Sequence, residues 1–197
     1  MKRIFILLLL PVLLLTAVSC REKDLEITVE EATEVLKDLV PRSYELNVIF
    51  FGEGLPVESP PETKPTSVTY QPVTADCGYT SVSQIMEKAE QVYSARYLDG
   101  VYVAAFFGVS AESDDGMLDT TVSPRYQEIG GKLQADMSAK VKNIRGRLEV
   151  LSATVEDATP TYVTTRAVCR DENGATVTLT VLLTIENGVW LLDSPTY

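Results

Sequence analysis

The stretch TVTLTVLLTI, residues 176–185, alternates between threonine and aliphatic residues along most of its length. A period of two places the two sets on opposite faces of a β-strand, so one face is expected to be buried and the other exposed to solvent. An Asn-Gly pair follows at 187–188, and another precedes at 173–174. Asn-Gly between alternating runs is a strong hairpin signal, so this strand is expected to pair on both sides.

Further runs with a strand-like pattern lie on either side of this strand. Together they predict an antiparallel β-meander in the C-terminal half, with one solvent-exposed face and helices covering the other. The first of them is a hairpin with a tight turn at Gly130-Gly131. The expected strands are 126–129, 132–137, 148–155, 162–170 and 189–193.

The N-terminal part begins with a helical pattern. Thr28 and Glu31 form a capping box, and apolar residues follow at helical spacing. Pro41 is expected to end this helix at or before Val40. The run Leu46–Phe51 is then predicted to be a strand.

A second capping box, Ser81 with Gln84, opens a helix whose apolar face continues to Tyr93. A further helical piece with an aromatic stripe is expected over 97–106. The proline-rich stretch 56–65 is expected to be an exposed loop, and Val68–Pro72 an edge strand. These elements predict the α+β class: an antiparallel β-meander sheet packed against N-terminal and central helices, as a single domain over residues 28–197.

The first twenty residues have the features of a bacterial lipoprotein signal. Lys2 and Arg3 precede an apolar run from Ile4 to Leu15, and the small residues 17–19 come directly before Cys20. Residues 1–19 are therefore predicted to be a signal peptide and Cys20 to carry the lipid. Residues 20–27 would form the lipidated tether.

The alternative for this segment is a transmembrane helix. The apolar stretch contains Pro11 and is shorter than the ~20 residues that a span requires, which favours the lipoprotein interpretation. Two or three acyl chains anchor a protein stably. The expected location is therefore extracytoplasmic, at the bacterial cell membrane, with contact to the membrane through Cys20.

Charge and composition exclude several classes of function. The chain of 197 residues has a net charge of −11 and contains no histidine. Nucleic acid is therefore an unfavourable partner, and Ser-His-Asp, Cys-His and His-ligated zinc sites are excluded. No Ser-x-x-Lys motif, phosphate loop or calcium loop is present. A protein that is not an enzyme, with no cofactor and no metal, is expected, and a monomer is the expected state.

Two cysteines remain besides Cys20. Cys77 and Cys169 would close a loop of about ninety residues if they formed a disulfide, which an oxidising location permits. Two separate buried thiols are the alternative, since the sequence does not give their separation. A catalytic cysteine is disfavoured because no histidine is available to activate it.

An acidic loop is expected at Ser110–Asp119. Its carboxylates do not have the alternate-residue spacing of a calcium loop, so a solvated turn or a partner-binding element remains. The candidate partner-binding residues are Glu112, Asp114, Asp115 and Asp119.

The order of these parts, over about Thr28–Tyr197, resembles the IseA (YoeB) family of secreted inhibitors of NlpC-type cell-wall D,L-endopeptidases. The resemblance rests on 92–94 (Val-Tyr-Ser), 131–133 (Gly-Lys-Leu) and 187–190 (Asn-Gly-Val-Trp). Val189 separates the glycine from the tryptophan, which tend to be adjacent in that family. The resemblance implies that the acidic loop enters the positively charged cleft of a cell-wall hydrolase.

The C-terminal pattern Gly-x-Trp-x-x-Asp-x-Pro also resembles the nuclear-transport-factor-like cone, a fold that hosts enzymes and binding modules alike. That resemblance implies a small-ligand pocket between sheet and helix; the alternative is that the same rings fill the core. The residues of this tail are Gly188, Trp190, Asp193 and Pro195, and the candidate pocket rings are Tyr93, Tyr97, Phe106 and Trp190.

The function expected first is that of a lipid-anchored binding protein that inhibits or modulates a cell-wall D,L-endopeptidase by occluding its cleft. A cone-like lipoprotein domain that binds a small ligand without catalysis is the alternative. A wall glycosidase that uses two carboxylates is the third hypothesis, but no sequence feature selects a pair at the required separation.

Overall fold

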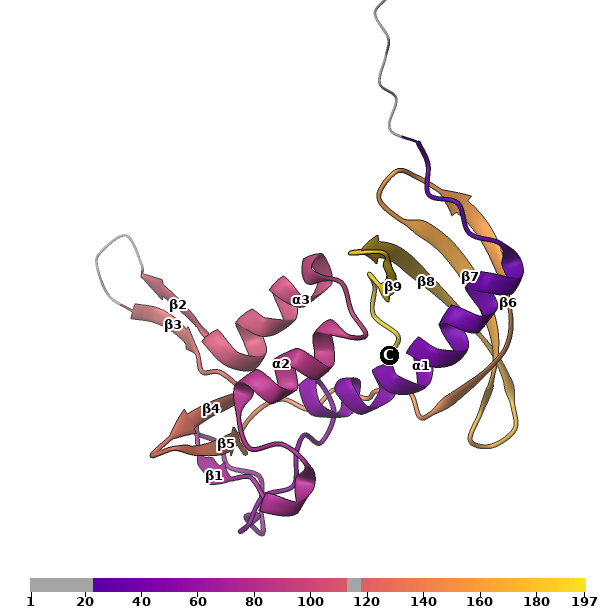
Figure 1. The fold of residues 1–197 in the computed structure, drawn as a ribbon. Coiled ribbons are helices and arrows are strands. Elements are labelled where there is room, and N and C mark those ends of the chain that lie inside the picture. Colours follow the sequence, from indigo (N-terminus) through magenta and orange to yellow (C-terminus); the bar gives the residue numbers. More distant parts are fainter. Residues whose placement is uncertain (1–22, 113–117) are drawn as a thin grey trace, which may run out of the picture.

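A computed structural model describes residues 23–112 and 118–197 of the chain, without the side chains of 110–121. The predicted signal peptide and the lipidation site at Cys20 lie outside the described residues. Two antiparallel sheets and three α-helices make up most of the rest, which confirms the α+β class and is consistent with a single domain (Figure 1).

Helix α1 (Val29–Phe50) begins as predicted, because the Thr28 hydroxyl accepts a hydrogen bond from the Glu31 N–H at 3.1 Å. It does not end at Val40. The helix continues past Pro41 to Phe50, so the predicted helix end and the predicted strand at 46–51 are both wrong.

Burial explains why α1 continues through a proline. A proline inside a helix costs about 3 kcal/mol, because it removes one hydrogen bond and crowds the preceding turn. Beyond it, Leu46, Ile49 and Phe50 continue the helical spacing, and each side chain is at most 7% exposed. Burying a side chain of this size contributes roughly 1.5–3 kcal/mol, so the three together exceed the cost of the proline.

The predicted meander is confirmed for its last four strands. Strands β6 (Leu148–Ala158), β7 (Val163–Asp171), β8 (Thr176–Glu186) and β9 (Val189–Leu192) pair in that order. On β8, the side chains of Leu179, Val181 and Leu183 are buried as expected. Helix α1 packs against β6 and follows this sheet in Figure 1.

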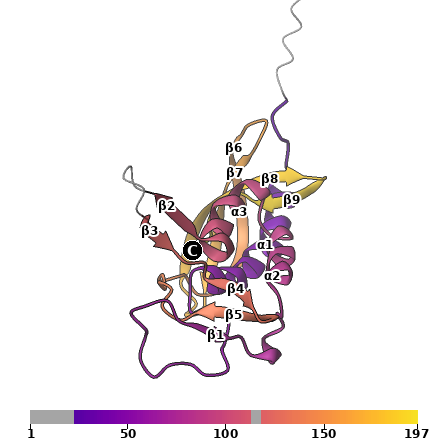
Figure 2. The same cartoon turned by 90° about the vertical axis from the view of Figure 1, so that its left-hand side faces the viewer.

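A second sheet corrects the extent of the meander. Strands β4 (Tyr126–Ile129) and β5 (Lys132–Asp136) form the predicted hairpin, but they pair with β1 (Tyr70–Pro72) in the order β1-β5-β4. The connection 137–147 leads from this hairpin to β6 instead of continuing the same sheet. In Figure 2 the small sheet lies at the lower end of the molecule. Strand β1 is an edge strand, as predicted.

The central helices cover the core between the two sheets. Helix α2 (Val82–Glu90) follows its N-cap Ser81, whose hydroxyl accepts a hydrogen bond from the Gln84 N–H at 3.3 Å. Helix α3 (Ala95–Tyr102) continues into a single wide helical turn, η2 (Val103–Phe107). A short 3-10 helix, η1 (Ala75–Cys77), precedes α2. Both helices were predicted. Their buried side chains include Ile85, Ala89, Leu98, Val101, Tyr102, Ala105 and Phe106.

The segment expected to be an acidic loop contains two strands. Strands β2 (Val109–Glu112) and β3 (Leu118–Val122) pair antiparallel, so the loop prediction for 110–119 is wrong at both of its ends. By contrast, the proline-rich stretch 56–65 is the predicted loop, with only Val57 bridging to Val73.

Candidate functional site

The β2–β3 hairpin stands away from the body of the molecule in Figures 1 and 2. Within the described residues, its two strands pair only with each other and form a sheet of their own. Val109 lies opposite Val122 at the root, and the pairing continues outward to Glu112 and Leu118. An isolated two-stranded sheet is at best marginally stable in water. We call the paired strands, residues 109–112 and 118–122, the projecting hairpin.

Exposed apolar side chains gather where the projecting hairpin leaves the helices. Phe107 is 66% exposed, the highest value for a large apolar residue in the described chain. Val103, Val109 and Val122 are 40–47% exposed. Val103 and Phe107 are the two ends of η2, and Val109, two residues after Phe107, pairs with Val122. We call Val103, Phe107, Val109 and Val122 the apolar base, because exposed apolar residues that gather in one part of a surface mark interaction sites.

The backbone at the root is closely fitted. Gly108 has φ +72°, and a Cβ atom there would lie 2.6 Å from the Val122 carbonyl oxygen. The Gly108 N–H donates to the Val103 carbonyl at 2.7 Å, and the Arg125 N–H donates to the Ala104 carbonyl at 3.2 Å. Only glycine adopts this conformation without strain. The root is therefore fixed to the end of the helices while the strands extend away.

Two neighbouring phenylalanines have opposite environments. Phe106 is buried, and its ring centroid lies 5.9 Å from that of Phe50 and 5.3 Å from that of Tyr102. Phe107 follows directly and is exposed. The core contacts of Phe106 fix the direction in which Phe107 leaves the helix. Sequence reasoning missed Phe107, although the aromatic doublet before Gly108 was a visible signal.

Two of the four predicted partner-binding residues lie on the strands of the projecting hairpin. Glu112 ends β2, and Asp119 lies in β3. Asp114 and Asp115 lie outside the described residues. The topology therefore brings Glu112 and Asp119 to the same hairpin, and their role in binding stays a prediction.

A second candidate is a groove of about 710 Å³ between the end of α2, α3 and the β8–β9 turn. Glu90, Asp99 and Glu186 line it, together with Tyr93 and Tyr102. The Glu186 carboxylate accepts a hydrogen bond from the Ala95 N–H at 3.1 Å, at the first residue of α3. A carboxylate at a helix N-terminus is favourable for the helix dipole, so Glu186 already has a structural role.

The four rings considered for a cone-like pocket do not line one cavity together. Tyr93 borders the groove, but its hydroxyl is buried and donates to Asn47 Oδ1 at 2.9 Å. Burial raises the pKa of Tyr93 to about 12. Tyr97 stacks beside Tyr93, with ring centroids 4.7 Å apart, and Phe106 belongs to the core. The Trp190 indole donates to Glu31 on α1 at 3.1 Å.

The two cysteines considered for a disulfide are separate thiols in this structure. Cys169 lies on β7 and is fully buried, and burial raises the pKa of its thiol. Cys77 is half-buried in η1, where its sulfur lies 3.3 Å from the Tyr79 carbonyl oxygen. Both pack with the core, which is the alternative left open by the sequence.

Within residues 23–112 and 118–197, no group of three or more carboxylates and thiols is placed to hold a metal ion. In the same part of the chain, none of the helices combines the length and the apolar character of a membrane span. No protein-family model matches the chain, and no curated protein matches it.

Proposed function

We propose that this protein is a lipid-anchored extracytoplasmic binding protein that inhibits or modulates a cell-wall D,L-endopeptidase. In this proposal it is not an enzyme, and the projecting hairpin occupies the cleft of the hydrolase. The observation that carries the proposal is the apolar base, with Phe107 66% exposed beside a hairpin that stands away from the body. The lipid on Cys20 holds the protein at the membrane.

The hairpin combines two features that suit a cleft. Acidic residues 112 and 119 lie on its strands, and 114 and 115 come between these strands in the sequence. In the proposal these charges favour approach to a positively charged groove. The apolar base then supplies surface to bury once the hairpin has entered. A rigid aromatic anchor surrounded by smaller apolar contacts is the usual composition of a binding hot spot. Occlusion of the cleft by these residues excludes the substrate without any chemistry.

Inhibition is measured with a soluble form that begins at Arg21, titrated against a purified NlpC-type D,L-endopeptidase digesting peptidoglycan. We expect dose-dependent inhibition that weakens with salt, since surface charges steer the association. Phe107→Ser is expected to weaken inhibition by roughly 30-fold, the effect of a hot spot of about 2 kcal/mol. Val68→Ser is the matched control, because Val68 is also exposed, at 51%, and lies outside the hairpin.

Three outcomes contradict the proposal or one of its parts. If several such hydrolases are not inhibited at micromolar protein, the resemblance concerns the fold only. If Phe107→Ser inhibits as well as the unchanged protein, the apolar base is not the contact. Unchanged inhibition after Asp114→Asn with Asp115→Asn would reject the acidic residues as the steering element.

The groove beside α3 supports the alternative function, a cone-like lipoprotein domain that binds a small ligand. Three carboxylates, Glu90, Asp99 and Glu186, line it against a single cation, Arg42, and this excess of negative charge suits a ligand that carries an amine. Binding of amine-bearing wall peptides by the unchanged protein but not by Asp99→Asn, together with absence of hydrolase inhibition, would favour this alternative.

A further inference from the structure

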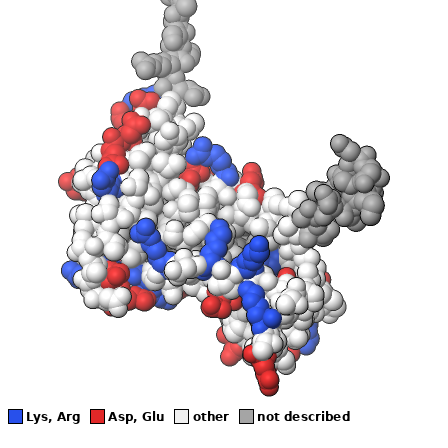
Figure 3. Space-filling model, turned by 180° about the vertical axis from the view of Figure 1, so that it is seen from behind, with Lys and Arg blue, Asp and Glu red and all other residues white. Residues whose placement is uncertain are grey.

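A basic segment crosses this otherwise acidic protein. Residues 138–147 (SAKVKNIRGR) connect β5 to β6 and contain four cations and no acidic residue. The cations are Lys140, Lys142, Arg145 and Arg147, and all four are exposed. The connection runs behind α1 in Figure 1, and in the opposite view of Figure 3 Lys and Arg gather across the middle of the molecule.

The segment is held in place along its length. The Lys142 N–H donates to the Phe51 carbonyl at 2.7 Å. The ammonium group of Lys142 lies 4.7 Å from the centroid of the Phe51 ring and 5.1 Å from that of Tyr197. Cation–π contacts of this kind fix the position of a charge without neutralising it. The positive charge is therefore presented at a defined place.

Neighbouring carboxylates neutralise only one end of the segment. The guanidinium of Arg147 lies 3.7 Å from a Glu45 carboxylate oxygen, and its backbone N–H donates to the Glu172 carboxylate at 3.3 Å. Lys140 and Arg145 make no ion pair within the described residues. At the other end, the Lys64 ammonium group donates to the Ala139 carbonyl at 2.6 Å and adds a further cation.

We propose that Lys64, Lys140, Lys142 and Arg145, which we call the basic surface, bind a linear polymer of phosphate groups outside the cell membrane. This site is separate from the projecting hairpin. Lys140 to Arg145 is one irregular stretch of chain that spans at most about 17 Å if fully extended, so its charges lie close together. A linear polyanion can contact all of them, and four cations are enough for binding that depends strongly on salt.

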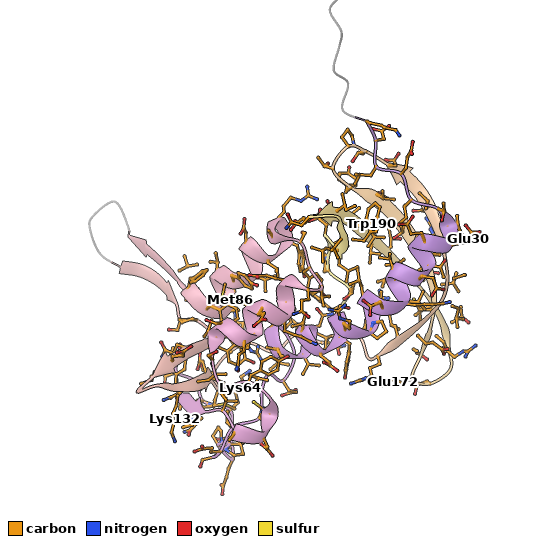
Figure 4. The ribbon with its side chains drawn as sticks, in the orientation of Figure 1. Glu30, Lys64, Met86, Lys132, Glu172 and Trp190 are labelled. Carbon is orange, nitrogen blue, oxygen red and sulfur yellow. The ribbon has the colours of Figure 1, made fainter. Side chains whose placement is uncertain are left out.

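The anchoring bilayer is a less favourable occupant than a polymer. The tether leaves the molecule beside the β6–β7 turn, where the Leu25 N–H donates to the Thr159 carbonyl at 2.9 Å. The basic surface crosses the middle of the molecule instead, and Lys64 lies far from the tether in Figure 4. The basic surface therefore lies away from the point where the tether leaves the molecule.

The test uses the soluble form from Arg21 and long-chain inorganic polyphosphate as the probe, without any hydrolase. We expect binding. A plot of the logarithm of the association constant against the logarithm of the salt concentration should have a slope of roughly −2 to −3. Lys140→Gln with Arg145→Gln is expected to reduce affinity by about tenfold or more and to halve that slope. Both residues are exposed, so this variant should fold. Lys37→Gln with Lys88→Gln removes the same charge from α1 and α2 and should bind as the unchanged protein does.

Absence of polyphosphate binding at low salt would overturn the proposal, as would equal losses in the two double variants. Poly-L-glutamate bound as tightly as polyphosphate would reject the phosphate assignment. Tighter binding to phosphatidylglycerol vesicles, lost in Lys140→Gln with Arg145→Gln, would assign the surface to the membrane instead. Because no hydrolase is present, failure of the proposed inhibition leaves this result unaffected.

Discussion

The hydroxyl of Tyr126, on β4, donates a hydrogen bond to the Ile49 carbonyl oxygen near the end of α1, at 2.9 Å. The same hydroxyl accepts from the Leu55 N–H at 3.1 Å. Arg125 acts beside it, because its guanidinium donates to the Gly52 carbonyl at 2.5 Å. The last turn of α1 contains no basic residue, so Arg125 supplies the positive charge that a helix C-terminus favours. The small sheet is thereby fastened to the long helix.

Replacement of Tyr126 by phenylalanine is expected to lower the free energy of unfolding by about 1–3 kcal/mol. The change leaves the Leu55 N–H and the Ile49 carbonyl without their partner, and a buried unsatisfied group costs about that much. Urea denaturation of the soluble form measures the effect. Tyr162→Phe is the control, since no hydrogen bond of the Tyr162 hydroxyl is found in the described chain. Equal stability of Tyr126→Phe and the unchanged protein would show that this connection is unimportant.

Replacement of Pro41 by alanine is expected to raise the free energy of unfolding by about 1–2 kcal/mol. Alanine restores the N–H that can donate to the Lys37 carbonyl and removes the clash with that turn. The gain is smaller than the full cost of proline because proline also restricts the unfolded chain. Thermal unfolding measures it. A loss of stability would indicate that the chain does not continue as a helix through this position.

The elements that local residues determine were predicted correctly. At the β8–β9 turn, Asn187 has φ +52° and Gly188 has φ +80°, which is the conformation that an Asn-Gly turn requires. The N-caps at Thr28 and Ser81 likewise depend on contacts within one turn. For these elements, the sequence contains both partners of the interaction within a few residues.

The elements that distant contacts determine were not predicted. The continuation of α1 past Pro41 depends on burial of Leu46, Ile49 and Phe50 against residues far along the chain. The pairing of β5 with β1 instead of β6 depends on where the connection 137–147 leads, and the period of two does not contain that information. The acidic residues of the candidate site were visible in the sequence, but the exposure of Phe107 was not.

Alkaline pH is expected to destabilise the protein in part through Tyr93. Burial raises the pKa of this phenol from 10 to about 12, so between these values the folded state retains a proton that the unfolded state has lost. The free energy of unfolding therefore falls as pH rises, by roughly 1.4 kcal/mol per unit for this group, and no further above about pH 12.

Tyr93→Phe isolates this contribution, because other buried tyrosines with raised pKa values, such as Tyr126, remain. Its unfolding free energy should fall less steeply than that of the unchanged protein between pH 10 and pH 12. Denaturant unfolding at a series of pH values measures the two slopes. Parallel slopes would indicate that the Tyr93 phenol is not desolvated in the folded protein.

Gly108→Ala is expected to disturb the projecting hairpin while leaving the stability of the core nearly unchanged. An alanine Cβ would lie 2.6 Å from the Val122 carbonyl oxygen, and φ +72° is strained for any residue with a side chain. Only the root of the hairpin needs to move to relieve this contact, because Phe106 remains packed in the core. We therefore expect inhibition of the hydrolase to weaken by at least about tenfold, while the free energy of the main unfolding transition changes by about 1 kcal/mol or less.

Gly100→Ala, on α3, is the control because a Cβ there meets no atom within 4 Å. Unchanged inhibition by Gly108→Ala, together with unchanged backbone exchange in β2 and β3, would show that the orientation of the hairpin does not matter for binding.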